Sequence, residues 1–452
     1  MRISLISTYE LGHQPFGLAS PAAWLQELGV EVTCLDLAIQ PFSPTDPAIA
    51  QADLIAFYLP MHTATRLAIP LIRRIKRLNP AAHLCAYGLY APVNEAYLRQ
   101  LGVASILGGE FEQGLVALAA GLSTENLPDH PAISLARQQF RVPDRTELPA
   151  LGNYAHLTVA GETRTVGYTE ASRGCKHLCR HCPIVPVYNG RFRIIQPDIV
   201  LADIRQQVAA GAQHITFGDP DFFNGPTHAL RIMHGLYAEF PDLTYDVIIK
   251  VEHLLKHADL LPVLRDTGCL FVTSAVEAVD EQILTIFDKG HTQSDFAKAV
   301  QLLQNVGLTL NPTFVSFTPW TTVAGYAKFL ATIANLGLVD YVTPIQYAIR
   351  LLIPAGSKLL TQDDIWEGID LRPFDPNALI YPWSHPDPRM DKLYEDVFRL
   401  VKVNERSGES RRIHFERVWQ TAVCLLPPDQ IPPIQMPPLE VEHIPTISES
   451  WY

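Results

Sequence analysis

The sequence predicts an α/β protein in which two series of alternating strands and helices precede a helical C-terminal part. Three observations predict this class. Strand-length apolar runs recur between helical patterns over residues 1–125, and a second such series covers residues 162–350. Residues 351–452 carry one strong helical pattern, followed by a proline-rich tail. Between the two series, residues 126–161 lose this periodicity and gather prolines, which favours an ordered linker.

The first series contains five apolar runs, each followed by a loop and a segment of helical period. The runs cover residues 3–7, 30–37, 53–59, 83–87 and 105–107. Alternation of apolar strands with helices predicts a doubly wound parallel sheet, and ligands of such sheets bind at the carboxyl ends of the strands. The loops expected at those ends contain His13, His62, Thr63, Gly88, Gly108 and Gly109.

The second series contains six strand candidates. They cover residues 165–171, 214–217, 245–250, 270–274, 309–315 and 341–346. Helical patterns such as residues 197–210 and 280–287 separate them. The helical pattern of the C-terminal part follows at Lys392, Leu393, Val397, Leu400 and Val401. The tail behind it is expected to wrap the body of the protein or to stay mobile, and a lid or partner-docking arm is the alternative.

Three cysteines lie close together after the first strand of the second series. Cys175, Cys179 and Cys182 have the spacing C-x3-C-x2-C, so their thiolates can turn towards one metal centre. A structural zinc ion takes four protein ligands, whereas a cubane iron–sulfur cluster held by three cysteines leaves one iron open. A zinc site completed by His177 or His181 is the alternative interpretation.

The cysteine spacing after a strand resembles the signature of the radical S-adenosylmethionine (SAM) superfamily. The resemblance implies a 4Fe-4S cluster whose open iron binds SAM, and an electron from that cluster that cleaves SAM to a 5'-deoxyadenosyl radical. It further implies that the six strand–helix units form a partial (β/α)6 barrel with its chemistry at the carboxyl ends of the strands. The implied partner is an electron donor such as flavodoxin or ferredoxin.

Other stretches resemble the superfamily's SAM contacts. Gly218, Asp219 and Pro220 look like the Gly-Gly-Glu-Pro stretch that receives the SAM amino group, and a carboxylate suits an ammonium group. A simple Gly-Asp-Pro turn is the alternative. Glu277 is similar to the carboxylate near the ribose hydroxyls, although Ala275 stands where the family usually has glycine.

Three more residues are candidate SAM contacts on the same resemblance. His181 takes the position of an aromatic residue that lies against adenine. Lys250, at the end of the third strand, is expected either to reach the SAM carboxylate or to be a solvated lysine. Gln346, at the end of the sixth strand, completes the set.

The first series resembles the cobalamin-binding domain of the cobalamin-dependent radical SAM group, over about residues 1–125. The likeness rests on the order of the elements and the positions of the loops. Because no Asp-x-His-x-x-Gly run is present, it implies a cobalt with no protein imidazole below it. The alternatives are solvated loop histidines and a module that binds no corrin. Within the superfamily, residues 218–225, residues 346–357 and the proline-rich end resemble a group that carries a cysteine- or selenocysteine-containing tail, which is not seen at Trp451-Tyr452.

Composition restricts the function further. The 452 residues include 35 Lys and Arg and 47 Asp and Glu, so the net charge is −12, which argues against a nucleic-acid or membrane-surface role. Seven cysteines, four of them scattered among apolar neighbours, favour free thiols in the reducing cytoplasm. We therefore expect a cytoplasmic radical SAM enzyme acting on a small molecule, with cobalamin-dependent methyl transfer first among the reactions. A radical SAM enzyme without cobalamin and a non-enzymatic zinc scaffold are the alternatives.

Overall fold

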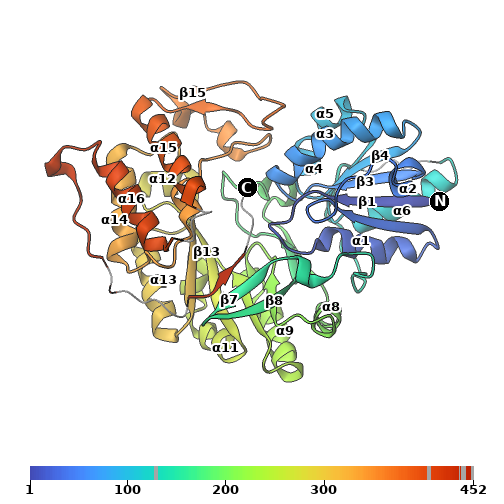
Figure 1. The fold of residues 1–452 in the computed structure, drawn as a ribbon, viewed down its shortest axis with the longest axis horizontal. Coiled ribbons are helices and arrows are strands. Elements are labelled where there is room, and N and C mark those ends of the chain that lie inside the picture. Colours follow the sequence, from blue (N-terminus) through green and yellow to red (C-terminus); the bar gives the residue numbers. More distant parts are fainter. Residues whose placement is uncertain (127–130, 405–408, 437, 439–443, 449–452) are drawn as a thin grey trace.

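Two sheets dominate the computed structural model, one in an N-terminal unit and one in a central unit beside it (Figure 1). The structure describes residues 1–126, 131–404, 409–436, 438 and 444–448. The helical C-terminal part lies against the central unit, on the side away from α8 (Pro197–Ala209) (Figure 1). No helix among the described residues is both long and apolar enough to cross a membrane.

The N-terminal sheet has six parallel strands in the order β2-β1-β3-β4-β5-β6. Its strands are β1 (Arg2–Ser7), β2 (Glu31–Asp36), β3 (Leu54–Tyr58), β4 (His83–Tyr87), β5 (Ser105–Gly109) and β6 (Ile133–Ser134). Apolar side chains of α1 (Phe16–Gln26) and α6 (Glu112–Ser123) form a core on one face, and those of α3 (His62–Leu78) form a second core on the other. The predicted doubly wound parallel sheet is therefore confirmed.

The central sheet has seven strands in the order β14-β13-β12-β11-β8-β7-β17, and its curled form is that of a partial barrel. The five parallel strands are β8 (Glu162–Thr169), β11 (His214–Phe217), β12 (Thr244–Ile248), β13 (Cys269–Glu277) and β14 (Thr309–Phe314). The helices between and after them are α8, α9 (Pro226–Glu239), α10 (Val251–Lys256), α11 (Leu261–Asp266), α12 (Glu281–Phe287), α13 (Gln293–Val306) and α14 (Val323–Asn335).

The prediction of a sixth barrel strand over residues 341–346 is wrong. The chain there forms the 3-10 helix η4 (Pro344–Tyr347), because Pro344 has no N–H for a strand ladder and suits a helical first turn. The amide N–H of Phe314, at the end of β14, instead donates to the side-chain oxygen of Gln346 at 2.8 Å. The sixth barrel position is held by a single parallel bridge between Phe317 and Arg350.

The segment between the two predicted units is ordered where the structure describes it, and it supplies strands to both sheets. It gives β6 to the N-terminal sheet and β7 (His156–Val159), antiparallel to β8, to the central sheet. Residues 127–130 lie outside the described part. The C-terminal part contains the predicted helix α15 (Pro388–Asn404) and a second helix, α16 (Arg411–Val423), that the sequence did not indicate.

Shorter elements complete the fold. They are α2 (Pro47–Ala50), α4 (Tyr90–Val93), α5 (Glu95–Gln100), η1 (Leu151–Asn153), β9 (Ser172–Gly174), α7 (Val185–Tyr188), β10 (Phe192–Ile194), η2 (Phe222–Asn224), η3 (Ala258–Leu260), η5 (Lys358–Thr361), η6 (Asp363–Trp366), β15 (Asp370–Leu371), β16 (Trp383–Ser384), η7 (Pro428–Gln430) and β17 (Thr446–Ile447). After the proline-rich stretch, β17 pairs antiparallel with β7. The described end of the tail therefore wraps back onto the central sheet.

Candidate active site

The cysteine loop leaves the central sheet at the carboxyl end of β8. It follows the short strand β9, which pairs antiparallel with β10. Gly174 has φ +77°, and a Cβ there would meet the Tyr188 ring at 2.3 Å and the Arg191 carbonyl oxygen at 2.5 Å, so this turn requires glycine. The loop then turns again, because the amide of Cys182 donates to the carbonyl of Cys179 at 3.1 Å.

The surroundings of the three thiols suit a negatively charged metal–thiolate centre. Burial raises the pKa of the Cys175 thiol, and it raises that of Cys182 to about 12, so burial disfavours the thiolates and a positive partner favours them. Two cations lie close by. Nζ of Lys250 is 3.8 Å from Sγ of Cys179, and the pKa of Lys289 is raised, against the effect of burial, by Glu277 and then by the Cys179 and Cys182 thiols. Three thiols beside two lysines fit the donor set of a cluster with one open iron.

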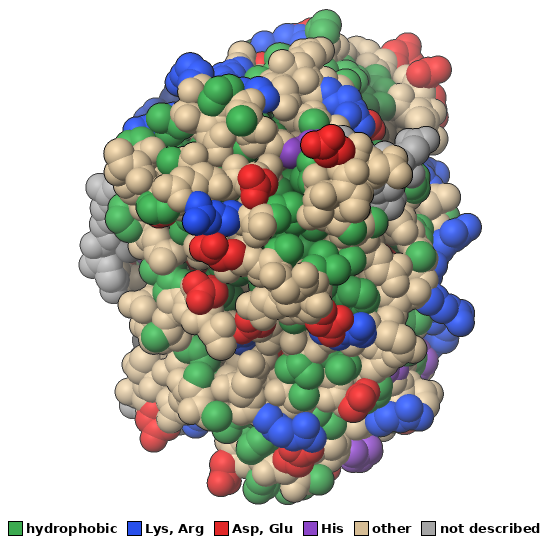
Figure 2. Space-filling model, turned by 90° about the vertical axis from the view of Figure 1, so that its right-hand side faces the viewer, with side chains coloured by type: hydrophobic (Ala, Val, Ile, Leu, Met, Phe, Trp, Pro, Cys, Tyr) green, Lys and Arg blue, Asp and Glu red, His purple; other side chains and the backbone are tan. Residues whose placement is uncertain are grey.

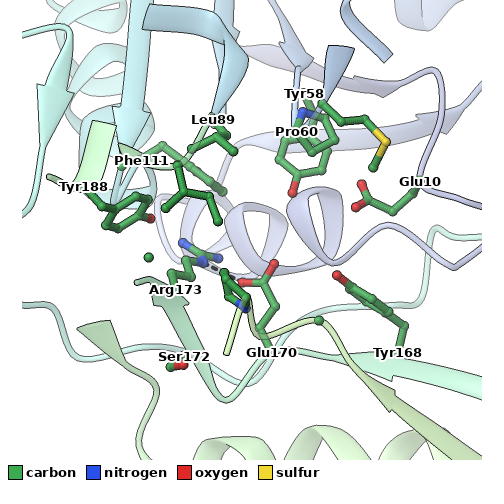
Figure 3. Close-up of a pocket in the computed structure, with 17 residues that line it drawn as sticks. Glu10, Tyr58, Pro60, Leu89, Phe111, Tyr168, Glu170, Ser172, Arg173 and Tyr188 are labelled. Atoms are coloured by element: carbon green, nitrogen blue, oxygen red, sulfur yellow. Dashed lines mark hydrogen bonds and ion pairs between the residues drawn. The ribbon is translucent and has the colours of Figure 1, made fainter. Parts of the chain in front are cut away.

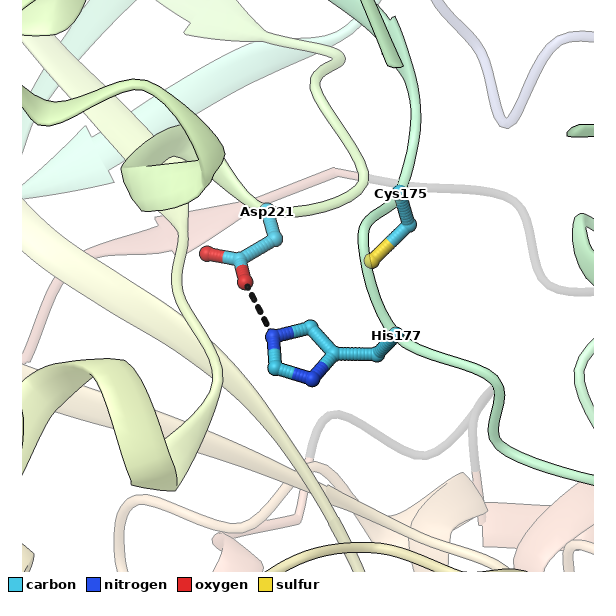
Figure 4. A group of neighbouring side chains, drawn as sticks. All are labelled: Cys175, His177 and Asp221. Carbon is cyan, nitrogen blue, oxygen red and sulfur yellow. Dashed lines mark ion pairs between the residues drawn. The ribbon is translucent and has the colours of Figure 1, made fainter. Parts of the chain in front are cut away.

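A second group of metal-binding side chains touches the first cysteine. Ligand atoms of Cys175, His177 and Asp221 lie within 4.8 Å of one another (Figure 4). Asp221 is fully buried, and its Oδ2 is 3.6 Å from Nε2 of His177 and 2.6 Å from Nδ1 of His253. Burial and the nearby Lys250 lower the pKa of His177 to about 4, so its ring is neutral. This group contains only one of the three cysteines, whereas the zinc interpretation joins all three to one histidine.

The predicted ribose carboxylate, Glu277, lies beside the cysteine loop. A register shift in β13 and a φ of +68° put this residue in the left-handed region, which a non-glycine residue adopts only at a cost. Its Oε1 is 3.1 Å from Nε2 of His181 and 3.3 Å from Nζ of Lys289. Despite burial, Lys289 and then His181 hold the pKa of Glu277 at about 2, so the carboxylate is ionised.

The structure thus brings the predicted SAM contacts Glu277 and Lys250 to the cysteine loop, which itself contains His181. One face of the His181 ring stacks on Phe287 at 4.2 Å between ring centroids, so a planar ligand would have to use the other face. Gln346, in contrast, is buried, and its side-chain oxygen accepts the β14 bond described above. Its side chain secures the barrel edge.

Asp219 is buried with both carboxylate oxygens occupied. They accept hydrogen bonds from the amide of Ala171 and the hydroxyl of Ser172, which fixes the connection between β8 and β9. Burial raises the pKa of Asp219 to about 7. Gly218 packs against Tyr168, whose hydroxyl oxygen would lie 1.9 Å from an added Cβ. The Gly-Asp-Pro stretch therefore supports the start of the cysteine loop, and contact with SAM remains a prediction.

We expect Asp219→Asn to lower the free energy of unfolding by about 1–3 kcal/mol. The NH₂ group of asparagine would replace one carboxylate oxygen, so the amide of Ala171 or the hydroxyl of Ser172 would lose its acceptor. If Asp219 also receives the SAM amino group, the variant keeps its iron and loses SAM affinity. Urea unfolding measures the first effect, and equilibrium binding of SAM to the iron-loaded protein measures the second. If the variant keeps both its stability and its SAM affinity, Gly218, Asp219 and Pro220 form an ordinary turn.

A cavity lies where the N-terminal sheet meets the central unit (Figure 3). Its volume is about 280 Å³, and its wall combines loops after β1, β3, β4 and β5 with residues around the cysteine loop. Of the predicted residues, Gly88, Gly109, Gly218 and Pro220 line it.

Four other predicted residues do not line the cavity. They are His13, His62, Thr63 and Gly108. The ring of His13 lies 5.1 Å from that of Tyr168, and Nε2 of His62 is 2.7 Å from the Ala378 carbonyl oxygen. Both histidines are therefore engaged in contacts within the chain, which differs from the expectation of solvated loop histidines.

Several polar residues of the cavity were not singled out from the sequence. Glu10 follows β1, Tyr58 ends β3, Tyr168 lies near the end of β8, Glu170 precedes β9, and Arg173 is the middle residue of β9. Figure 3 shows the carboxylates of both glutamates and the hydroxyls of both tyrosines pointing into the same space. Their signal in the sequence was their place at or near the carboxyl ends of strands, and in the first series the prediction used that place only for glycines, histidines and Thr63.

Arg173 joins the two units. Its guanidinium lies 2.8 Å from Glu112, 2.6 Å from Glu170 and 3.8 Å from Glu110, and all four side chains are largely buried. It also lies over the Phe111 ring, 4.7 Å from the centroid. Burial raises the pKa of Glu110 to about 7, whereas Arg173 keeps that of Glu112 below its usual value despite burial.

Comparison with known families identifies the central unit. Residues 169–320, which contain the cysteine loop, β11, β12, β13 and β14, match the model of the Radical SAM superfamily. Residues 169–320 therefore form a radical SAM domain, the catalytic domain of radical SAM enzymes.

Two solved structures share the fold over most of the chain. The cobalamin-dependent radical SAM enzyme OxsB, with aqua-cobalamin and SAM bound, is 14% identical with a TM-score of 0.69, covering 89% of this chain and 67% of that one. The radical SAM methyltransferase TsrM from Kitasatospora setae, with cobalamin and a 4Fe-4S cluster bound, is 16% identical with a TM-score of 0.62, covering 97% and 91%. At this identity the likeness is one of fold.

Curated relatives match about half of the chain. The ribosomal protein uS12 methylthiotransferase RimO of Syntrophotalea carbinolica is 24% identical over 237 residues, which are 48% of this chain and 49% of the relative. The tRNA-2-methylthio-N(6)-dimethylallyladenosine synthase of Haemophilus influenzae is 25% identical over 232 residues, 48% of each chain. The chain thus spans about half the length of these relatives. Because one of them is named for tRNA, the exclusion of nucleic acid stays a prediction.

Proposed function

We propose that this enzyme cleaves SAM reductively at a cluster held by Cys175, Cys179 and Cys182, and that the resulting radical acts on a small molecule in the cavity between the two units. One observation carries the proposal: the cavity wall contains Gly174, directly before Cys175, together with residues of the N-terminal unit. A substrate held there would lie next to the loop that carries the cluster ligands.

The chain's own residues supply the remaining functions in this proposal. When held by the three cysteines, a 4Fe-4S cluster would supply the electron for reductive cleavage of SAM into methionine and a 5'-deoxyadenosyl radical. Lys250 and Lys289 offset the negative charge of the thiolates, and Glu277, held ionised by Lys289 and His181, offers an acceptor for ribose hydroxyls. A flavodoxin or ferredoxin is the proposed electron donor, and the cytoplasm the proposed location.

Anaerobic purification tests the proposal. It requires a brown protein with about four irons per chain, which releases 5'-deoxyadenosine when SAM and reduced flavodoxin are added. One zinc per chain, with no colour and no 5'-deoxyadenosine, would instead identify the scaffold alternative.

Cobalamin-dependent methyl transfer is the second candidate, and the fold shared with OxsB and TsrM favours it. The cavity in its present shape does not fit a corrin. Its volume lies just below the roughly 300–1,000 Å³ usual for pockets of drug-sized ligands, which are smaller than a corrin with its side chains. The bulky rings of Tyr58, at the end of β3, and of Phe111, after β5, occupy the wall on the side of the N-terminal unit, and no histidine lines the cavity in the described part of the chain. We therefore derive no step through cobalamin.

We expect the full-length protein not to bind hydroxocobalamin at about 100 μM. Its dissociation constant would then exceed this concentration, so the binding free energy would be less favourable than roughly −5.5 kcal/mol. Equilibrium dialysis measures this. Tighter binding would show that the cavity opens and would restore methyl transfer as the leading reaction. Electron paramagnetic resonance of the Co(II) form would then show whether an axial nitrogen is present, with His13 and His62 as the first residues to replace.

A further inference from the structure

We infer that the cavity binds the ammonium group of an organic amine, so that the substrate is a small amine with an apolar body. This inference deepens the proposed function, because it takes the cavity as the substrate site. It rests on the charge balance around the cavity, on one buried carboxylate without a partner and on the convergence of acceptor groups seen in Figure 3.

Carboxylates outnumber cations at the junction of the two units. Glu110, Glu112 and Glu170 share a single ion-pair partner among the described residues, Arg173. Glu10 forms no ion pair with any described residue. The junction therefore holds four carboxylates and one guanidinium. Burial raises the pKa of Glu10, Glu110 and Glu170, so these carboxyls tend to hold protons while the cavity is empty. A cation bound among them would favour their ionised forms and pair with the charge that Arg173 leaves unbalanced.

Glu10 is the group that a ligand would satisfy. The residue is only 7% exposed, and its Oε2 has no hydrogen-bond partner although it is buried. Its carboxylate points into the cavity, towards the space that Tyr58, Tyr168 and Glu170 also face (Figure 3). A buried acceptor without a partner is uncommon in folded proteins and indicates a missing donor.

The converging groups match the shape of an ammonium ion. An ammonium carries three N–H donors and no acceptor, and the carboxylates of Glu10 and Glu170 with the two phenol oxygens supply acceptors on several sides. Aromatic rings near a cation add attraction through their faces. Apolar wall residues such as Pro60, Leu89 and Ile184 suit a hydrocarbon body, and the volume of about 280 Å³ limits its size.

Binding of probe compounds tests this inference without any turnover. We would titrate para-fluorobenzylamine into the full-length, iron-loaded protein and follow the fluorine NMR signal, up to about 10 mM. Para-fluorobenzyl alcohol has almost the same shape but no charge, and para-fluorobenzoate has the opposite charge. We expect saturable binding of the amine and at least tenfold weaker binding of the other two.

Two variants locate the site. Glu10→Gln keeps the size of the side chain and removes its charge, so the amine should bind at least tenfold more weakly. Glu95→Gln, at an exposed ion pair with Arg99, is the matched control and should leave binding unchanged. Equal binding of amine and alcohol to the wild-type protein, no binding of the amine, or unchanged amine binding by a folded Glu10→Gln variant would each overturn the inference. The comparison of amine with alcohol needs no variant, so it holds even if Glu10→Gln is unstable.

The outcomes also separate this inference from the proposed function. Release of 5'-deoxyadenosine from SAM reports on the cluster and needs no amine. Amine binding reports on the cavity and needs no SAM. If the enzyme cleaves SAM but binds amine and alcohol equally well, the proposed function stands and the inference of an amine substrate is wrong. If the protein binds the amine but does not cleave SAM, the amine site stands and the proposed function is wrong.

Discussion

Replacing Cys175, Cys179 and Cys182 together by alanine should abolish iron binding and the release of 5'-deoxyadenosine. These three thiols are the clustered soft ligands of the chain, and no other cysteine lies near them in the sequence. Iron should fall from about four atoms per chain to near zero. Elemental analysis of the anaerobically reconstituted protein and chromatography of the SAM products measure the two effects.

Cys424→Ala provides the matched control for this variant. Cys424 is an exposed free cysteine at the end of α16, far from the loop in sequence, so iron content and SAM cleavage should stay unchanged. Circular dichroism should show that the triple variant keeps its helices. Iron at the wild-type level in the triple variant would contradict the cluster assignment. Zinc in the wild-type protein that disappears from the triple variant would assign the cysteines to a zinc site.

Arg173→Met should destabilise the protein by about 3–5 kcal/mol, because it leaves the buried carboxylates of Glu110, Glu112 and Glu170 without their cation. Methionine roughly keeps the length of the side chain and can still pack on Phe111. Urea unfolding measures the loss. Arg205→Met, which removes an exposed ion pair with Glu239, is the control and should change stability little.

The loss at Arg173 should grow with pH. The pKa of Glu110 is raised in the folded protein to about 7, so the folded state binds more protons than the unfolded state, and stability falls as the pH rises from about 4.5 to 7. Without Arg173 the pKa of each neighbouring carboxyl rises further, and ionisation costs more. The difference between variant and wild type should therefore be larger at pH 8 than at pH 5.5. A difference independent of pH would show that packing, and not charge, accounts for the loss.

Much of the fold could be predicted because apolar runs and helical periods reflect burial directly. Strands β1 to β5 of the N-terminal sheet and the five parallel strands of the central sheet fall on runs visible in the sequence, from residues 3–7 to residues 309–315. The prediction of a sixth barrel strand gave an apolar run more weight than Pro344, which has no N–H for a strand ladder. That the side chain of Gln346 bonds the end of β14 could not be inferred from local sequence. Strand β6 has only two residues and pairs with the distant β5, so no local pattern shows it. Strand β7 pairs with the adjacent β8 through a tight turn, and it was missed because residues 126–161 were interpreted as a linker.

The candidate site, too, could be predicted where its residues are close together in the sequence and was missed where they are far apart. The cysteine loop could be predicted since its ligands lie within eight residues of one another. Glu277, His181 and Lys250 came from a family resemblance, and the structure brings Glu277 and Lys250 to that loop. The cavity was missed, because Glu10 and Glu170 are 160 residues apart and meet only when the two units pack together. Local sequence also gives no sign that one arginine serves three glutamates.

The pairing of β17 with β7 protects the protein against aggregation through the edge of its central sheet. An uncovered edge strand offers free N–H and C=O groups to other chains and promotes aggregation. Here Thr446 and Ile447 cover part of β7, the last strand on that side of the sheet before the tail. Proteolysis or a bulky fusion that displaces residues 444–448 would expose this edge. Purified protein trimmed before residue 444 should therefore self-associate more readily than the full-length chain.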